Sequence, residues 1–77
     1  MISYEKSKQI AVDKAKQYNV VIDKAYKLKD AFVFENSKDD IVGVLPIVVD
    51  KEGVCHGLWQ YINDNNLTMD DMIECEF

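Results

Sequence analysis

Arginine is absent from this 77-residue chain, and histidine, proline and glycine are scarce, with one, one and three copies. Without arginine the chain lacks the planar guanidinium that holds a phosphate group with two hydrogen bonds at once. The glycines, at positions 43, 53 and 57, are too far apart to form a phosphate-binding loop. We therefore expect neither direct nucleic-acid binding nor nucleotide chemistry.

Long apolar runs are absent too. No stretch approaches the roughly 20 apolar residues that cross a bilayer, and the first residues contain no apolar signal core behind a basic segment. The two cysteines, Cys55 and Cys75, are then expected to be reduced, apolar side chains rather than a disulfide. The sequence predicts a cytoplasmic protein that does not bind membranes.

Recognisable catalytic or metal-binding spacing is a third absence. The single histidine, His56, follows Cys55, and consecutive residues of a strand point to opposite faces, so an extended segment cannot bring the two together as a dyad. The cysteines and the histidine lack the paired spacing of a zinc site, and no acidic run has calcium-loop spacing. We predict no enzymatic activity, no cofactor and no metal.

Positive charge is missing from one end of the chain. The net charge is −5, but residues 1–51 carry nine lysines against eight acids, whereas residues 52–77 carry six acids and no lysine. Four of these acids lie close together near the C-terminal end: Asp70, Asp71, Glu74 and Glu76. An acidic surface favours a basic protein partner, so these four residues are the first candidate binding site.

The residues that are present indicate one globular domain spanning positions 1–77, with 48% hydrophobic and 30% charged residues. A helix is predicted from Tyr4 to Tyr18. Its inward face follows a spacing of three and four residues: Tyr4, Ser7, Ala11, Ala15 and Tyr18. Ser3 is placed to cap the first turn, and Asn19 tolerates the left-handed conformation that ends a helix.

Two hairpins are predicted after this helix. The first joins residues 20–28 to residues 31–35 through a tight turn. Its first strand is expected to place four apolar residues on one face: Val20, Ile22, Tyr26 and Leu28. The second hairpin joins a strand whose well-paired part is 47–49 to a strand over 54–59, through the turn Asp50-Lys51-Glu52-Gly53.

A final strand is predicted over residues 72–77, with Ile73, Cys75 and Phe77 pointing inward. Before it, Thr68 and Asp71 have the spacing of a capping box, so one helical turn is expected there. One helix followed by runs of strands predicts an α+β fold: a single N-terminal amphipathic helix packed on an antiparallel sheet of four to five strands built from hairpins.

Trp59 and Tyr61 form the second candidate binding site. Alternate positions of a strand share one face, so the two aromatic side chains are expected side by side if the segment that holds them is extended. Tryptophan and tyrosine dominate the energetics of protein interfaces, which favours a contact with a protein partner. The alternative interpretation is that both rings belong to the core.

Two hairpin segments carry a family resemblance: Ala31-Phe32-Val33-Phe34-Glu35 and Pro46-Ile47-Val48-Val49-Asp50-Lys51-Glu52-Gly53-Val54. Together with the alanine-containing helix, they resemble the immunity protein 35 family of small bacterial proteins. Phe32 and Leu45 depart from the tryptophan and the glycine usual in that family, and the segment before Pro46 is shorter. The resemblance implies a non-enzymatic protein that neutralises a polymorphic toxin, and it supplies no catalytic residue.

The leading hypothesis is a binding or inhibitory protein of immunity type, which neutralises a protein partner, a toxin or a nuclease, through its acidic C-terminal surface. One alternative is an inhibitor encoded by a phage or mobile element, whose acids mimic nucleic-acid phosphates. Another is a structural adaptor that associates through the edges of its sheet. The sequence leaves both a monomer and a small homo-oligomer open.

Overall fold

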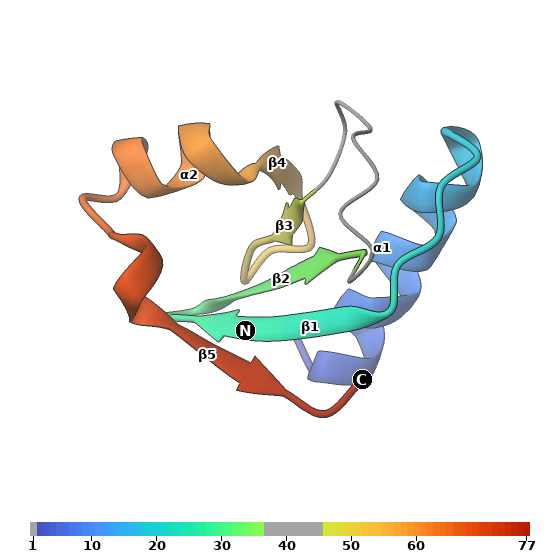
Figure 1. The fold of residues 1–77 in the computed structure, drawn as a ribbon, viewed down its shortest axis with the longest axis horizontal. Coiled ribbons are helices and arrows are strands. Elements are labelled where there is room, and N and C mark those ends of the chain that lie inside the picture. Colours follow the sequence, from blue (N-terminus) through green and yellow to red (C-terminus); the bar gives the residue numbers. More distant parts are fainter. Residues whose placement is uncertain (1, 37–45) are drawn as a thin grey trace.

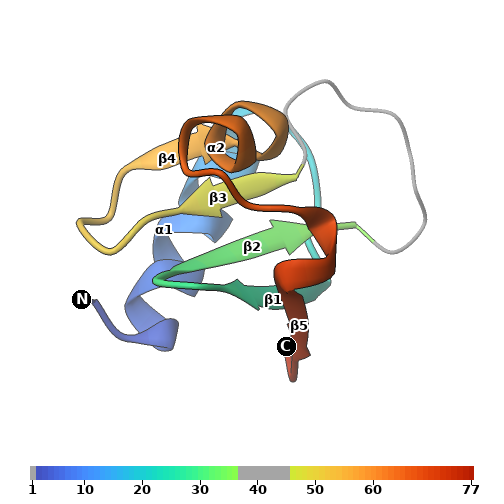
Figure 2. The ribbon, with the colours of Figure 1, turned by 90° about the vertical axis from the view of Figure 1, so that its left-hand side faces the viewer.

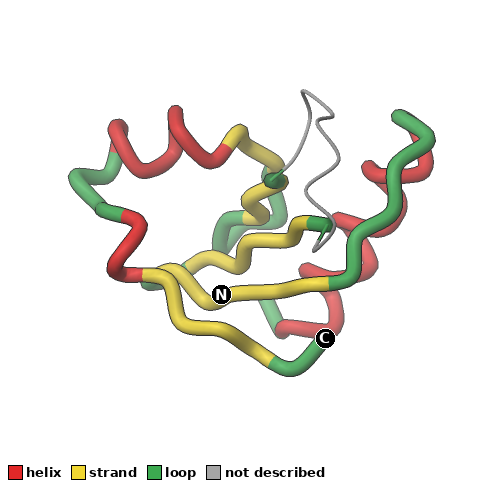
Figure 3. Tube along the Cα trace, in the orientation of Figure 1, coloured by secondary structure: helices red, strands yellow, loops and turns green. Residues whose placement is uncertain are grey.

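A five-stranded antiparallel sheet with the strand order β4-β3-β2-β1-β5 forms the centre of the molecule (Figure 1). The computed structural model describes residues 2–36 and 46–77. The strands of the sheet are β1 (Lys24–Leu28), β2 (Ala31–Glu35), β3 (Ile47–Val49), β4 (Cys55–Gly57) and β5 (Met72–Cys75). Two α-helices, α1 (Tyr4–Gln17) and α2 (Leu58–Asp64), and a short 3₁₀ helix, Met69–Asp71, accompany them (Figure 3). The predicted α+β fold is confirmed, with a second helix added.

Helix α1 begins and ends as its sequence predicts. The Ser3 hydroxyl accepts a hydrogen bond from the Lys6 amide at 3.1 Å, which caps the first turn. Tyr18 is the C-terminal cap, and Asn19 follows with a φ of 57°, the left-handed conformation that ends the helix. The inward face carries buried Ser7, Ala11 and Ala15, but Tyr18 is 48% exposed and does not belong to that face as expected.

One half of the core lies between α1 and the sheet. The fully buried residues of the helix are small, so its backbone lies close to β2 and β3, which supply most of the bulk. This core contains Ala11, Ala15, Ile22, Ala25, Phe32, Phe34, Ile47 and Val49. The ring of Tyr4, at the start of the helix, extends the packing: its centroid lies 5.1 Å from Phe32 in an edge-to-face arrangement.

The other half of the core lies between the opposite face of the sheet and α2 (Figure 2). It contains Leu28, Ala31, Val33, Val48, Leu58 and Ile62. The strand predicted over 54–59 is wrong beyond Gly57, because Leu58 and Ile62 are one helical turn apart and both reach this core. A helix of seven residues is too short to be stable by itself, so the packing of these two side chains maintains it.

Both predicted hairpins are present. Leu28 pairs with Ala31 across a two-residue turn in which Lys29 has a φ of 57°, and Val48 pairs with His56 in the second hairpin. The prediction that the apolar residues of segment 20–28 share one face of the sheet was wrong. Strand β1 begins only at Lys24, so Ile22 packs on the α1 side while Leu28 packs on the α2 side. Leu45, one of the two departures from the immunity protein 35 pattern, lies outside the described residues.

Strand β5 forms one edge of the sheet and β4 the other. Of the three residues expected to point inward, Cys75 packs against the α1-side core, whereas Ile73 is 68% exposed and Phe77 lies beyond the end of the strand and is also exposed. Met72 packs on the α2 side. Cys75 on β5 and Cys55 on β4 are both free thiols, as predicted, and they lie at opposite edges.

The described chain packs tightly for its length. The Cα radius of gyration is 11.2 Å, against the roughly 11.5 Å that a compact domain of this size adopts. Within residues 2–36 and 46–77, no helix is both long and apolar enough to traverse a bilayer.

Candidate functional site

The turn of the β3–β4 hairpin is organised by one carboxylate, that of Asp50. Its Oδ1 accepts hydrogen bonds from the backbone N–H groups of Glu52 and Val54, at 2.8 and 2.9 Å. Gly53 takes the left-handed φ of 84° that the turn requires, and its N–H donates to the Asp50 carbonyl at 3.0 Å. The sequence Asp50–Gly53 therefore folds locally into a rigid turn that presents the other oxygen of Asp50.

That second oxygen binds His56, whose Nε2 lies 2.6 Å from Asp50 Oδ2. Both side chains are partly buried, with exposed fractions of 34% for His56 and 19% for Asp50. Burial acts to raise the pKa of Asp50, but the hydrogen bonds from His56, Val54 and Glu52 together outweigh it and hold that pKa below its ordinary value. Asp50 is therefore a fully hydrogen-bonded carboxylate near neutral pH.

Helix α2 adds an aromatic ring beside this pair. The ring of Tyr61 lies 5.2 Å from the ring of His56, between centroids, and is tilted by 50°. The pKa of Tyr61 is raised by burial first, and then by the negative charges of Asp50 and Asp30. Its hydroxyl is therefore a neutral O–H at neutral pH, and it has no hydrogen-bond partner within 2–36 and 46–77.

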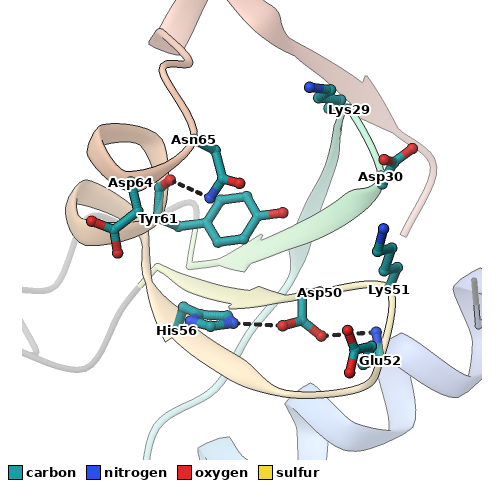
Figure 4. Close-up of a pocket in the computed structure, with 9 residues that line it drawn as sticks. All are labelled: Lys29, Asp30, Asp50, Lys51, Glu52, His56, Tyr61, Asp64 and Asn65. Carbon is teal, nitrogen blue, oxygen red and sulfur yellow. Dashed lines mark hydrogen bonds and ion pairs between the residues drawn. The ribbon is translucent and has the colours of Figure 1, made fainter.

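A cavity of about 370 Å³ opens between the β1–β2 turn, the β3–β4 turn and α2 (Figure 4). It is lined by Lys29, Asp30, Asp50, Lys51, Glu52, His56, Tyr61, Asp64 and Asn65. The Asn65 side chain is anchored by donation to the Tyr61 carbonyl at 2.9 Å. Charged groups, hydrogen-bonding groups and two aromatic rings thus converge on one concave surface, the arrangement common to binding sites.

The arrangement does not assemble a nucleophile. Cys55 packs toward the α1 side of the sheet, whereas His56 lies beside Tyr61 on the α2 side, as expected for consecutive strand residues. Burial, opposed in part by Lys14, raises the pKa of the Cys55 thiol, which disfavours the reactive thiolate. Among the side chains that the structure describes, no three His, Cys, Asp or Glu residues are grouped to hold a metal ion.

The structure separates the two aromatic residues that were predicted to share a face. Both lie on α2 and not on a strand, and positions two apart on a helix point in nearly opposite directions. Tyr61 turns toward the cavity and is half-buried, while Trp59 is 64% exposed. The core alternative is therefore wrong for Trp59, and the expectation of a side-by-side pair is wrong for both.

The four C-terminal acids are all exposed, but they have different surroundings. Asp71 is used within the 3₁₀ turn Met69–Asp71, where its Oδ2 accepts from the Thr68 amide at 2.8 Å in the predicted capping box. Glu74 lies on the edge strand β5, opposite Tyr26 of β1. Of the four, Asp70, Glu74 and Glu76 keep carboxylates that no hydrogen bond of the described chain engages.

The cavity itself escaped the sequence-based prediction. Two signals for it were present. Asp50 and His56 lie on the same face of one hairpin, because His56 pairs with Val48 and Asp50 is two residues further along that strand. The spacing of Leu58, Tyr61 and Ile62 also fits one face of a helix, on which Tyr61 sits at the margin of the buried stripe.

The fold and the cavity together define a small α+β domain with a helix on each face of an antiparallel sheet and a polar, concave site at one end of its second hairpin. Comparison of the chain with protein-family models, with curated proteins and with solved structures finds no match in any of the three.

Proposed function

We propose that this protein is a non-enzymatic binding or inhibitory protein that recognises a basic surface of a protein partner through α2 and the acidic segment that follows it. The observation that carries the proposal is Trp59, the single tryptophan of the chain, which is 64% exposed on a short helix. Holding so large an apolar ring in water has no benefit for folding, whereas tryptophan is enriched at the centre of protein interfaces.

The charge around α2 favours a basic partner. The helix and everything after it contain no lysine or arginine, and Asp64 ends the helix with an acid where the helix dipole favours a base. An acid at this position is unfavourable for the isolated helix, so it is better explained by a contact with positive charge elsewhere. The exposed carboxylates of Asp70, Glu74 and Glu76 extend the same negative potential and would accelerate encounter with that partner.

The proposed role agrees with the resemblance to the immunity protein 35 family, which implies a non-enzymatic protein that neutralises a toxin. In this reading α1 stabilises the sheet and α2 carries recognition. The toxin, or another basic protein such as a nuclease, is the expected partner, and the domain acts without cofactor or metal.

The test is affinity capture from a lysate of the source organism with the wild-type protein and two variants. Trp59→Ala should abolish capture of the specific partner, because loss of a central tryptophan typically costs 2 kcal/mol or more of binding free energy, about 30-fold in affinity. Val21→Ala is the matched control, since Val21 is 69% exposed in the segment that joins α1 to β1, across the molecule from α2 (Figure 1), and should leave capture unchanged. Equal capture by Trp59→Ala and wild type would exclude α2 as the recognition element.

The acidic segment is tested separately by charge reversal. Asp70→Lys, Glu74→Lys and Glu76→Lys, combined in one variant that retains the capping residue Asp71, should weaken the captured complex and reduce its sensitivity to salt. Undiminished binding would remove the electrostatic part of the proposal.

The same complex separates the alternatives. Displacement of the partner by duplex DNA would indicate a mimic of nucleic acid, and a mass that rises with protein concentration in light scattering would indicate a homo-oligomer.

A further inference from the structure

We infer that the cavity beside Asp50 and Tyr61 receives one arginine side chain of the partner, an inference that rests on the proposed function and names the chemistry of its contact. The cavity and the exposed tryptophan belong to the same helix: α2 directs Trp59 outward and contributes Tyr61 to the wall of the cavity. Because Trp59 and Tyr61 leave α2 in nearly opposite directions, a partner that contacts Trp59 and also enters the cavity has to span this short helix.

The balance of charge in the cavity favours a cation. Its lining contains four carboxylates, Asp30, Asp50, Glu52 and Asp64, against two ammonium groups, Lys29 and Lys51. The excess is negative by two charges, and it stays negative by one if His56 is protonated. The raised pKa of the Tyr61 hydroxyl, caused in part by Asp50 and Asp30, reflects the same negative potential inside the cavity.

The hydrogen-bonding groups that remain free are mostly acceptors. The Asp50 carboxylate already accepts three hydrogen bonds. It therefore contributes negative charge to the cavity and is not the preferred acceptor for a ligand. The Tyr61 hydroxyl and the Asp30 carboxylate have no partner in the described chain, and Tyr61 extends from α2 toward the side of the cavity where Asp30 lies (Figure 4). A ligand with several donors in one plane fits this set.

A guanidinium meets these requirements better than an ammonium. It is planar, it donates up to five hydrogen bonds, and its face stacks on aromatic rings such as those of Tyr61 and His56. The cavity volume, about 370 Å³, lies at the small end of the range for binding pockets and suits the end of one long side chain. Lys29 and Lys51 are exposed and flexible, so both can turn toward solvent when the cation enters.

The chain itself contains no arginine, so no internal side chain provides this group. An acidic, arginine-free protein with a cavity suited to guanidinium is complementary to an arginine-containing surface and is protected from binding a second copy of itself through that cavity.

The experiment uses N-acetyl-arginine methylamide as the probe and N-acetyl-citrulline methylamide as its uncharged isostere, added to the full chain while the aromatic NMR signals of Tyr61 and His56 are followed. The arginine probe should shift both signals in a saturable manner, and the citrulline probe should not. Equal responses to the two probes, or no response to either, would overturn the inference.

Two variants test whether the cavity prefers a positively charged ligand. Asp30→Asn should raise the dissociation constant of the arginine probe by roughly 1.5- to 5-fold, and Lys51→Gln should lower it by a similar factor, as expected for exposed charges. Asp13→Asn on α1 is the matched control and should change nothing. The reverse pattern, together with saturable shifts caused by N-acetyl-glutamate methylamide, would identify an anion site and contradict the inference.

The outcome is independent of the capture experiment. If Trp59→Ala abolishes partner capture while the arginine probe does not bind, the proposed function stands and the cavity inference fails. If the probe binds and the Trp59 variant captures the partner normally, the cavity binds a guanidinium but α2 is not the recognition helix.

Discussion

The two helices cover opposite faces of one sheet and differ in length, capping and exposure. Helix α1 has 14 residues, a capped start and a left-handed end, and its fully buried side chains are the small ones of Ser7, Ala11 and Ala15. Helix α2 has seven residues, lacks a side-chain cap at Gly57, and exposes its one tryptophan. Helix α1 therefore has its own stabilising local signals, whereas α2 depends on packing and exposes a large ring that folding alone does not favour.

The cores beneath the two helices differ in the same way. On the α1 side, the bulk comes from Phe32 and Phe34 of the central strand β2, with Tyr4 packed against them. On the α2 side, the aromatic residue Tyr61 lies at the margin, beside a cavity, and the buried contribution of the helix is Leu58 and Ile62. The aromatic bulk of the core is therefore on the α1 side, whereas the α2 side is filled by aliphatic residues and has the cavity at its margin.

The largest expected effect tests this difference directly. Phe34→Ala should destabilise the whole domain by about 3–5 kcal/mol, because Phe34 is fully buried between α1 and the sheet. Leu58→Ala should lower the free energy of unfolding by about 2–5 kcal/mol at most. In amide hydrogen exchange of this variant, the backbone N–H groups of α2 should exchange well before those of α1. Denaturant unfolding and hydrogen exchange measure both quantities. Simultaneous exchange of the two helices in Leu58→Ala would show that α2 is not an independent unit.

A smaller effect concerns the turn that shapes the cavity. Asp50→Asn should destabilise the domain by about 1–2 kcal/mol at neutral pH, because the charge-assisted bond to His56 is lost while an amide oxygen still accepts from the turn.

The same substitution has a pH signature with a definite sign. The folded pKa of Asp50 is below its ordinary value of 3.8, so the unfolded chain binds more protons in the acid range. The contribution of the ionised Asp50 to the free energy of unfolding is then complete above roughly pH 5 and is lost as the pH falls through the folded pKa. Stability curves of wild type and Asp50→Asn should converge at acid pH, and a constant difference from neutral to acid pH would contradict the assigned cause.

The smallest expected effect is a gain on the α1 side. The hydroxyl of Ser7 is fully buried against the sheet and has no hydrogen-bond partner in the described part of the chain. Ser7→Ala should therefore stabilise the domain by roughly 0.5–1 kcal/mol, since it removes an unsatisfied polar group and improves helix propensity. A rise in the denaturation midpoint with an unchanged slope is the expected measurement, and a fall would indicate that the hydroxyl has a partner in solution.

The elements that sequence reasoning identified are those with complete local signals. Ser3, the alanine spacing and Asn19 delimited α1, and the Asp50–Gly53 turn delimited the second hairpin. The signals for α2 were weaker, because its seven residues follow a strand directly and have no side-chain cap. The apolar run there fits a strand or a short helix equally well, and the extended reading placed Trp59 and Tyr61 on one face.

The candidate site could be anticipated only in part. The acidic character of the C-terminal third and the choice of Trp59 as a candidate contact residue followed from composition and residue type. The cavity required the β1–β2 turn to meet the β3–β4 turn and α2, which lie far from it in the sequence. No local spacing encodes that meeting, because it depends on which strands are neighbours in the sheet.

The sequence by itself determined the helix α1, the two hairpins, the charge asymmetry and the lack of arginine, since each depends on residues that are near neighbours or on simple counts. Only the tertiary structure decided that residues 58–64 are helical, that Trp59 is exposed, and that Tyr61 faces the pair formed by Asp50 and His56. The physical reason is that burial against the second face of the sheet selects the helix, and only a folded sheet has that face.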